Sequence, residues 1–122
     1  MKKEILVVDD SYTTLILLEW FLKENGYEAS IVIDVEKALE YLEKQTPDLI
    51  LLDIQMPKIS GYDFLKILRE ANKKIPILMI SANDSSENIK LVKELGASGF
   101  VAKPFKLNEL LIKVEELTID KQ

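Results

Sequence analysis

The sequence has 122 residues, a net charge of −5 and a pI near 4.8. This acidic balance argues against a nucleic-acid surface, because duplex binding depends on clustered Lys and Arg. The absence of cysteine and histidine excludes disulfides, thiolate or imidazole metal sites and a phosphohistidine on this chain. The N-terminal apolar run is too short for a signal peptide, and no stretch reaches the length of a membrane span. We therefore expect a soluble, cytoplasmic protein with no membrane partner and no direct contact with nucleic acid.

Short apolar runs alternate with amphipathic stretches of helical length along the chain, which is the spacing of βαβ crossovers. The runs expected to form strands are 5–8, 29–33, 49–52, 75–80 and 99–102. Helices are predicted over about 12–25, after a cap at Asp34, over 61–71, after a cap at Asp84 or Ser85, and from about Leu107. Glycines at 26 and 96 mark helix ends, and Pro47 stops the second helix. The pattern predicts one α/β domain over residues 1–122, with a parallel sheet buried on both faces and five flanking helices.

Polar residues follow four of the predicted strands. They are Asp9 and Asp10 after the first strand, Asp53 after the third, Ser81 after the fourth and Lys103 after the fifth. Ligands of open parallel sheets bind outside the carboxyl ends of the strands, at the point where the strand order reverses. We therefore expect these side chains to converge at one edge of the sheet.

Three neighbouring carboxylates repel one another unless their pKa values rise or they share a cation. Oxygen ligands suit Mg²⁺, which takes one or two carboxylates together with water and phosphate oxygens. An ammonium and a hydroxyl beside that ion would complete an environment for a phosphoryl group, and one carboxylate could then act as the nucleophile. Taken singly, the aspartates could be helix caps, the serine a loop residue and the lysine a solvated side chain. Asp53 fits a cap least well, because no predicted helix starts directly after it.

Four motifs carry a resemblance to a known family. They are ILVVDD at 5–10, LLDIQMPKISG at 51–61, ISA at 80–82 and GFVAKPF at 99–105. In order and spacing they resemble the receiver domain of two-component response regulators, from the first strand to the last helix. The resemblance implies a doubly wound, flavodoxin-like sheet with strand order 2-1-3-4-5, which brings the first and third strands side by side.

The resemblance also implies roles for the acidic residues. Asp53 would be the phosphoacceptor, receiving a phosphoryl group from a histidine on a sensor histidine kinase or a histidine phosphotransfer protein. The ligands of Mg²⁺ or Mn²⁺ would be Asp10, Asp53 and the backbone carbonyl of Gln55, with Asp9 acting largely through water. The domain would not be an enzyme in the usual sense, since it would catalyse only its own phosphorylation and dephosphorylation.

The remaining motif residues would couple phosphorylation to a change of surface. Lys103 would pair with the phosphoryl group, and the bond between Lys103 and Pro104 would be cis. Ser81 would move toward the phosphoryl group and let Phe100 turn inward. The surface of the fourth helix, the last strand and the fifth helix would then control an output domain or an effector protein, with the receiver a monomer or a phosphorylation-dependent dimer.

The first helix is more apolar than one buried face requires. The expected core stripe is Thr14, Leu17, Leu18, Phe21 and Leu22. This stripe leaves Leu15, Ile16 and Trp20 exposed, as a docking patch for the helical bundle of the phosphodonor or as a self-association surface. The alternative is that Trp20 packs against the sheet or a neighbouring loop.

Other functions fit the residues less well. An aspartate-nucleophile phosphohydrolase would usually carry a second acid two residues after Asp53, where this chain has Gln55. The segment DDSYTTLI has no glycine for a flavin phosphate loop, and no nucleotide-binding glycine motif occurs. A phosphorylation-independent interaction module remains the alternative. The chain ends in LTIDKQ, so we expect no second domain, whether the receiver acts alone or comes from a longer protein.

Overall fold

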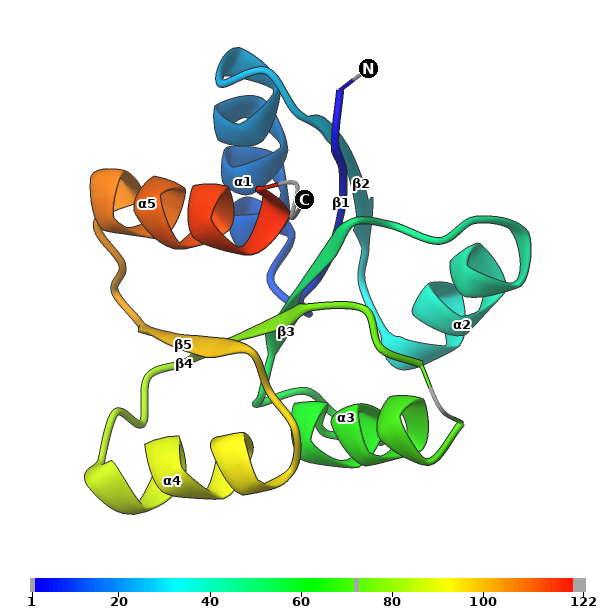
Figure 1. The fold of residues 1–122 in the computed structure, drawn as a ribbon, viewed down its shortest axis with the longest axis vertical. Coiled ribbons are helices and arrows are strands. Elements are labelled where there is room, and N and C mark those ends of the chain that lie inside the picture. The colour runs from blue at the N-terminus through cyan, green and yellow to red at the C-terminus, as the bar shows by residue number, and fades with distance from the viewer. Residues whose placement is uncertain (1, 72, 120–122) are drawn as a thin grey trace.

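A computed structural model of the protein describes residues 2–71 and 73–119. Five parallel strands form one sheet in the order β2-β1-β3-β4-β5 (Figure 1). The strands are β1 (Glu4–Val8), β2 (Glu28–Val32), β3 (Leu49–Asp53), β4 (Ile77–Ser81) and β5 (Gly99–Ala102). The predicted fold class and strand order are therefore confirmed, and β1 and β3 lie next to each other at the reversal of the strand order.

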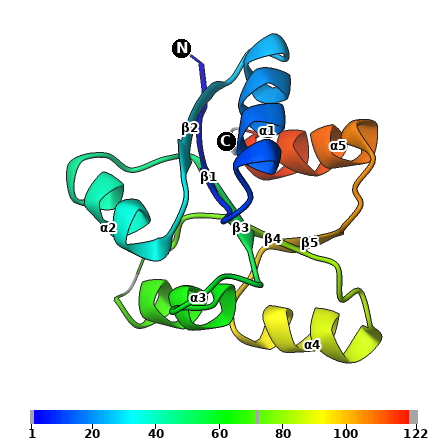
Figure 2. The same cartoon turned by 180° about the vertical axis from the view of Figure 1, so that it is seen from behind.

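Helices cover both faces of the sheet. They are α1 (Tyr12–Glu24), α2 (Val35–Lys44), α3 (Gly61–Glu70), α4 (Ser86–Glu94) and α5 (Leu107–Thr118). Two views from opposite sides place α1 and α5 together on one face and α2, α3 and α4 on the other (Figures 1 and 2). No helix within the described residues has the length and apolar character needed to cross a bilayer.

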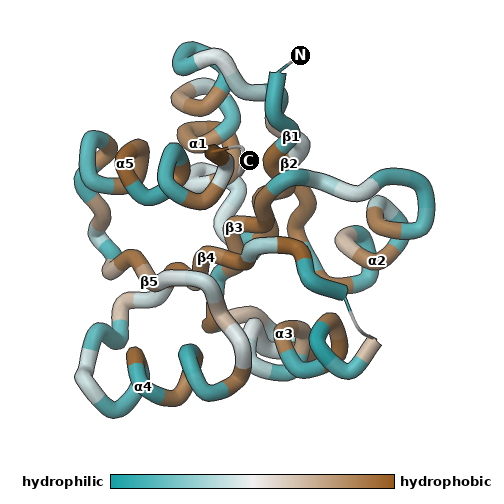
Figure 3. Tube along the Cα trace, in the orientation of Figure 1, coloured by the Kyte–Doolittle hydropathy of each residue, from teal (hydrophilic) through white to brown (hydrophobic). Residues whose placement is uncertain are grey.

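The strands are mostly apolar because residues of each strand pack into two hydrophobic clusters, one on each face of the sheet. Along β3, Leu49 and Leu51 join the cluster under α1 and α5, while Ile50 and Leu52 join the cluster under the other helices. The hydropathy-coloured trace shows the same contrast, with hydrophobic strands at the centre and helices of alternating character around them (Figure 3). A strand buried on both faces holds its last residue rigidly, which matters for Asp53.

Local signals set the helix boundaries close to the predicted ones. Asp34 caps α2 by accepting a hydrogen bond of 2.8 Å from the N–H of Lys37. Of the two candidates for the α4 cap, Ser85 is the residue that caps it. Gly26 and Gly96 adopt positive φ values of 91° and 105° just beyond α1 and α4, which favours glycine at both positions.

The rotation of α1 differs from the prediction. The residues of α1 that face the sheet are Leu15, Leu18 and Leu22, and Leu17 is 40% exposed. The predicted exposure of Leu15 and burial of Leu17 are therefore wrong, because a helix with apolar residues all around it carries no marker of which stripe turns inward. Ile16 and Trp20 are exposed as predicted, at 51% and 56%.

Candidate functional site

The predicted acidic cluster forms at the carboxyl edge of the sheet. Asp9 and Asp10 follow β1 and Asp53 ends β3, and the register pairs Val8 with Leu52 directly before them. One carboxylate oxygen from each aspartate lies within 4.8 Å of the other two. Asp9 and Asp53 are only 1% and 3% exposed, whereas Asp10 is exposed. Two buried acids beneath an accessible one form a small, solvent-facing anionic site.

Backbone groups fix the two buried carboxylates. Asp9 accepts a hydrogen bond of 2.8 Å from the N–H of Ser11, the residue that caps α1. Asp53 accepts one of 3.3 Å from the N–H of Gln55, so the loop after β3 turns around its carboxylate. Gln55 itself is exposed.

Gly61 lets α3 begin directly against the end of β3. Its N–H donates a 2.8 Å hydrogen bond to the carbonyl of Ile54. A Cβ atom built on Gly61 would collide with the backbone oxygen of Asp53 and lie 2.7 Å from the Cα of Ile54. The absence of a side chain at Gly61 therefore sets how closely α3 approaches the acidic site.

Lys103 extends from the end of β5 into the acidic cluster. Its Nζ lies 3.1 Å from Oδ2 of Asp9 and 3.6 Å from Oδ1 of Asp53. Its backbone N–H donates to the carbonyl of Ser81 at 2.8 Å, and the following peptide bond to Pro104 is cis, as predicted. Burial alone would lower the pKa of Lys103, but the hydrogen bond and charge of Asp9, with those of Asp53, outweigh it and raise that pKa. The lysine is therefore held in its charged form.

The carboxyl group of Asp53 is electrostatically unusual. Its pKa is raised to about 6, first by burial and then by the charge of Asp9. The charge of Lys103 and the N–H of Gln55 oppose the rise and lower the pKa. Asp53 is therefore ionised near neutral pH but poorly solvated, a state in which it gains from a neighbouring cation.

Ser81 and Phe100 occupy positions compatible with their predicted roles. Ser81 is the last residue of β4, buried beside Asp53, and its Oγ accepts a 3.0 Å hydrogen bond from the N–H of Asn83. Phe100 lies on β5, half-buried against the core cluster beneath α3 and α4. Whether either side chain moves during a switch stays a prediction.

The donor set of the cluster fits a hard divalent cation. All three groups are carboxylates, and one of them is open to solvent, which leaves room for water and phosphate oxygens. A chain without histidine or cysteine offers no nitrogen or sulfur donor of the kind that zinc prefers. The residues present therefore fit Mg²⁺ or Mn²⁺.

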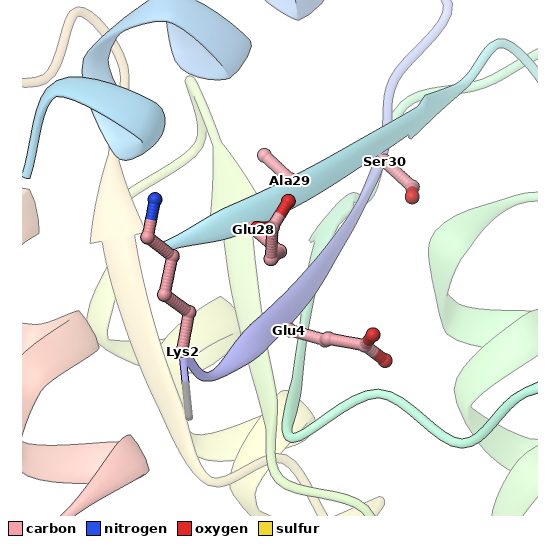
Figure 4. A pocket seen from close by; sticks show the side chains of 5 residues that line it. All are labelled: Lys2, Glu4, Glu28, Ala29 and Ser30. Carbon is pink, nitrogen blue, oxygen red and sulfur yellow. The ribbon is translucent and has the colours of Figure 1, made fainter. Parts of the chain in front are cut away.

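Two surface hollows lie at opposite edges of the sheet. One, of about 420 Å³, borders the site and is lined by Thr14, Leu17, Ala82, Lys103, Pro104 and Phe105. The other, of about 370 Å³, lies at the amino ends of β1 and β2 and is lined by Lys2, Glu4, Glu28, Ala29 and Ser30 (Figure 4). In the second hollow the charged side chains point in different directions and do not converge on one point (Figure 4).

Two polar residues near the site carry no signal in the sequence. Tyr62 of α3 donates a hydrogen bond to Oδ1 of Asn88 on α4, and Asn88 is only 5% exposed. The two residues are far apart along the chain, and none of the four sequence motifs includes either of them. Only the packing of α3 beside α4 brings them together.

Comparisons with known proteins agree with this geometry. Residues 5–115 match the family described as the response regulator receiver domain. The chain is 39% identical over 117 residues to the alkaline phosphatase synthesis transcriptional regulatory protein PhoP of Bacillus subtilis, covering 96% of this chain and 49% of that protein. It therefore spans about half the length of this curated relative.

Solved structures show the same likeness. The receiver domain of the Francisella response regulator 1452 superposes with a TM-score of 0.92 at 32% identity, covering 96% of this chain and 97% of that one. The chemotaxis protein CheY4 of Vibrio cholerae superposes with a TM-score of 0.89 at 31% identity, covering 96% of this chain and 99% of that one.

Proposed function

This chain belongs to the response regulator receiver domain family of two-component signalling, and from that premise we propose that it accepts a phosphoryl group on Asp53. The donor is a phosphohistidine on a sensor histidine kinase or a histidine phosphotransfer protein. The observation that supports this proposal best is the convergence of Asp9, Asp53 and the ammonium of Lys103 in one buried cluster.

The transfer needs few protein groups. A carboxylate oxygen of Asp53 attacks phosphorus, and the new O–P bond forms as the P–N bond to the donor imidazole breaks. The electron pair of the broken bond stays on the imidazole nitrogen, which takes up a proton from solvent. Lys103 pairs with a phosphoryl oxygen and offsets its negative charge, so catalysis is mostly positioning and electrostatic stabilisation.

A divalent cation would bind beside the phosphoacceptor. Asp10, Asp53 and the backbone carbonyl of Gln55 would hold Mg²⁺ or Mn²⁺, with Asp9 acting largely through water. When bound, the ion supplies positive charge that offsets the repulsion between the carboxylates and an incoming phosphoryl group. Asp9 and Lys103 orient one another before the donor arrives, through their 3.1 Å contact.

Phosphorylation changes the charge of the site and thereby the surface beside it. A phosphoryl group adds about −1.5 to −2 charges. Ser81 then moves toward it, Phe100 turns inward, and the surface of α4, β5 and α5 shifts toward the form that an output domain or effector recognises. The receiver acts on no substrate besides its own Asp53.

The test is an intact-mass measurement after incubation with Mg²⁺ and acetyl phosphate. We expect one phosphoryl adduct that requires Mg²⁺ and is absent from Asp53→Asn. The matched control is Asp48→Asn, because Asp48 is an exposed aspartate at the opposite edge of the sheet and its loss leaves the adduct intact.

Failure of this test has two distinguishable meanings. An adduct that forms only with a purified phosphorylated histidine kinase indicates a receiver that accepts protein donors alone. No adduct with either donor would contradict the proposal and favour a phosphorylation-independent interaction module.

The exposed apolar side chains of α1 support a docking surface for the phosphodonor. The exposed apolar residues are Ile16, Leu17 and Trp20, whereas Leu15 is buried. Because Leu17 lines the hollow beside Lys103, this patch extends to that hollow. Truncation of a peripheral contact in such an interface costs about 1 kcal/mol, a roughly fivefold effect.

Ile16→Ala is therefore expected to slow transfer from the protein donor about fivefold while leaving acetyl phosphate labelling unchanged. Ile67→Ala is the matched control, since Ile67 is an exposed isoleucine of α3 on the other face of the sheet. Equal rates for both variants, together with an unaffected Trp20→Ala, would eliminate the docking surface.

A further inference from the structure

A buried amide joins three segments beside the site. Asn88 lies in the first turn of α4 and is 5% exposed. Its Oδ1 accepts a hydrogen bond from the hydroxyl of Tyr62, its Nδ2 donates to the carbonyl of Asn83 at 2.7 Å, and its N–H donates to Oγ of Ser85 at 3.2 Å. The side-chain oxygen and the side-chain nitrogen of Asn88 therefore each have a protein partner. Asn83, which binds the side chain, and Ser85, which binds the backbone N–H, both lie in the loop between β4 and α4.

The same network reaches the predicted switch residue. The carbonyl of Asn83 is held by Asn88, and the N–H of Asn83 donates to Oγ of Ser81 at 3.0 Å. The side chain of Asn83 accepts a further 3.2 Å hydrogen bond from the N–H of Ser85. The backbone of Asn83 is thus fixed at both its carbonyl and its N–H, and the hydroxyl of Ser81 is tied to that fixed segment.

Tyr62 anchors the network in the core. It lies directly after Gly61, whose close approach to Asp53 sets the start of α3. Its half-buried ring packs against the same core cluster as Phe100, and its hydroxyl reaches across to α4. A displacement of Phe100 or of the β4–α4 loop would therefore act on the contact between Tyr62 and Asn88.

We propose that Tyr62 and Asn88 are positioning residues that restrain Ser81 in the unphosphorylated state. This inference rests on the proposed function of Asp53 as phosphoacceptor. Movement of Ser81 toward a phosphoryl group requires the β4–α4 loop to leave the position that the hydrogen bonds of Asn88 fix. Because these bonds stabilise only the unphosphorylated arrangement, they set the equilibrium between the two states and slow phosphorylation.

The first test is Tyr62→Phe, which removes the hydroxyl and keeps the packed ring. A hydrogen bond of this kind contributes about 0.5–1.5 kcal/mol, so labelling by acetyl phosphate should accelerate about two- to twelvefold. Tyr27→Phe is the matched control. It removes a half-buried tyrosine hydroxyl that contacts Thr118 at 3.2 Å on the other face of the sheet. Both variants should lose similar stability toward urea, and only Tyr62→Phe should change the labelling rate.

The restraint is also measurable without phosphorylation. In Tyr62→Phe, hydrogen exchange at the N–H of Asn83 should accelerate by about the same two- to twelvefold, with no change in Tyr27→Phe. This readout keeps the two proposals separable. A wild-type protein that forms no adduct overturns the function of Asp53, whereas unchanged exchange at Asn83 overturns the restraint on Ser81.

A second variant tests whether the two residues act together. Asn88→Asp keeps the acceptor for Tyr62 and removes the donor to the carbonyl of Asn83. If both residues act through one network, the double variant should label no faster than the faster single variant. Multiplying effects, or a labelling rate in Tyr62→Phe equal to or below that of wild type, would overturn the proposal.

Discussion

Both edges of the sheet carry acidic residues and a lysine, but these side chains are exposed at the amino edge and largely buried at the carboxyl edge. At the amino edge, Lys2 and Glu28 are exposed around a hollow of about 370 Å³, and the carboxylate of Glu4 points away from both (Figure 4). At the carboxyl edge, Asp9 and Asp53 are almost fully buried and Lys103 lies between them. A surface hollow lined in part by charged residues occurs at both edges, so a hollow alone does not identify the functional edge.

The difference lies in what burial does to a charge. A solvated carboxylate at the amino edge interacts with water and counterions, and an exposed pair there contributes little. A buried carboxylate lacks that solvation, and the pKa of Asp53 is raised to about 6 as a result. The fold therefore carries a local electrostatic cost at the carboxyl edge, of the kind expected where a cation and a phosphoryl group bind.

The largest expected effect comes from removing the ammonium at the carboxyl edge. Lys103→Met should slow labelling by acetyl phosphate roughly 10²–10³-fold, the usual loss when one preorganised donor to a reacting group is removed. Lys2→Met, at the amino edge, should leave the rate unchanged. Equal decreases in the labelling rate of both variants would show that the two edges do not differ in function.

Gly61 should show a smaller effect on the rate. A methyl group there must push α3 away from Asp53, so Gly61→Ala should destabilise the fold by about 1–3 kcal/mol and slow labelling at least about tenfold. Gly26→Ala is the control, because its positive φ also makes alanine costly while no atom lies within 4 Å of its Cβ position. Urea unfolding of both variants and their labelling rates separate positioning from stability. A normal labelling rate in Gly61→Ala would show that the spacing of α3 does not position Asp53.

The third expected effect is on the pH dependence of the free energy of unfolding without metal, and it vanishes at low pH. The pKa of Asp53 rises from 3.8 to about 6 on folding, so the folded state binds the proton more tightly. The resulting stabilisation is complete below about pH 4 and is lost as the pH rises through about 6. Asp53→Asn should therefore be more stable than wild type by roughly 1–3 kcal/mol at pH 8, and the difference should vanish near pH 4.

Urea unfolding in the presence of a chelator measures this difference. Glu28→Gln at the amino edge should show no comparable pH-dependent gain, since Glu28 is exposed. A constant difference between Asp53→Asn and wild type across this pH range would contradict the electrostatic account of the carboxyl edge.

The sequence predicts the residues at the carboxyl edge well because the topology of the sheet determines where most of them lie. Once the alternation of strands and helices is recognised, parallel strands bring Asp9, Asp53 and Lys103 to one edge without any further information. The cis bond before Pro104 follows from the family resemblance. The caps of α2 and α4 follow from side chains that bond to the nearest backbone, so they too can be read locally.

Features that depend on how helices pack cannot be predicted from the sequence pattern. The rotation of α1 depends on which of its apolar stripes fits the sheet. The prediction places Leu17 in the core and Leu15 on the surface, and the structure has the reverse. The contact of Tyr62 with Asn88 depends on α3 lying beside α4, and no sequence pattern within either helix indicates it. Side-chain hydrogen bonds between distant elements are the least predictable part of the site.

The most direct test of the contrast between the two edges is an NMR titration of the ¹⁵N-labelled protein with Mg²⁺. We predict saturable shifts at the amides of Asp10, Gln55 and Lys103, with the amides of Glu4 and Glu28 unchanged. Equal shifts at both edges, or none at the carboxyl edge, would contradict the assignment of the buried cluster as the metal and phosphoryl site.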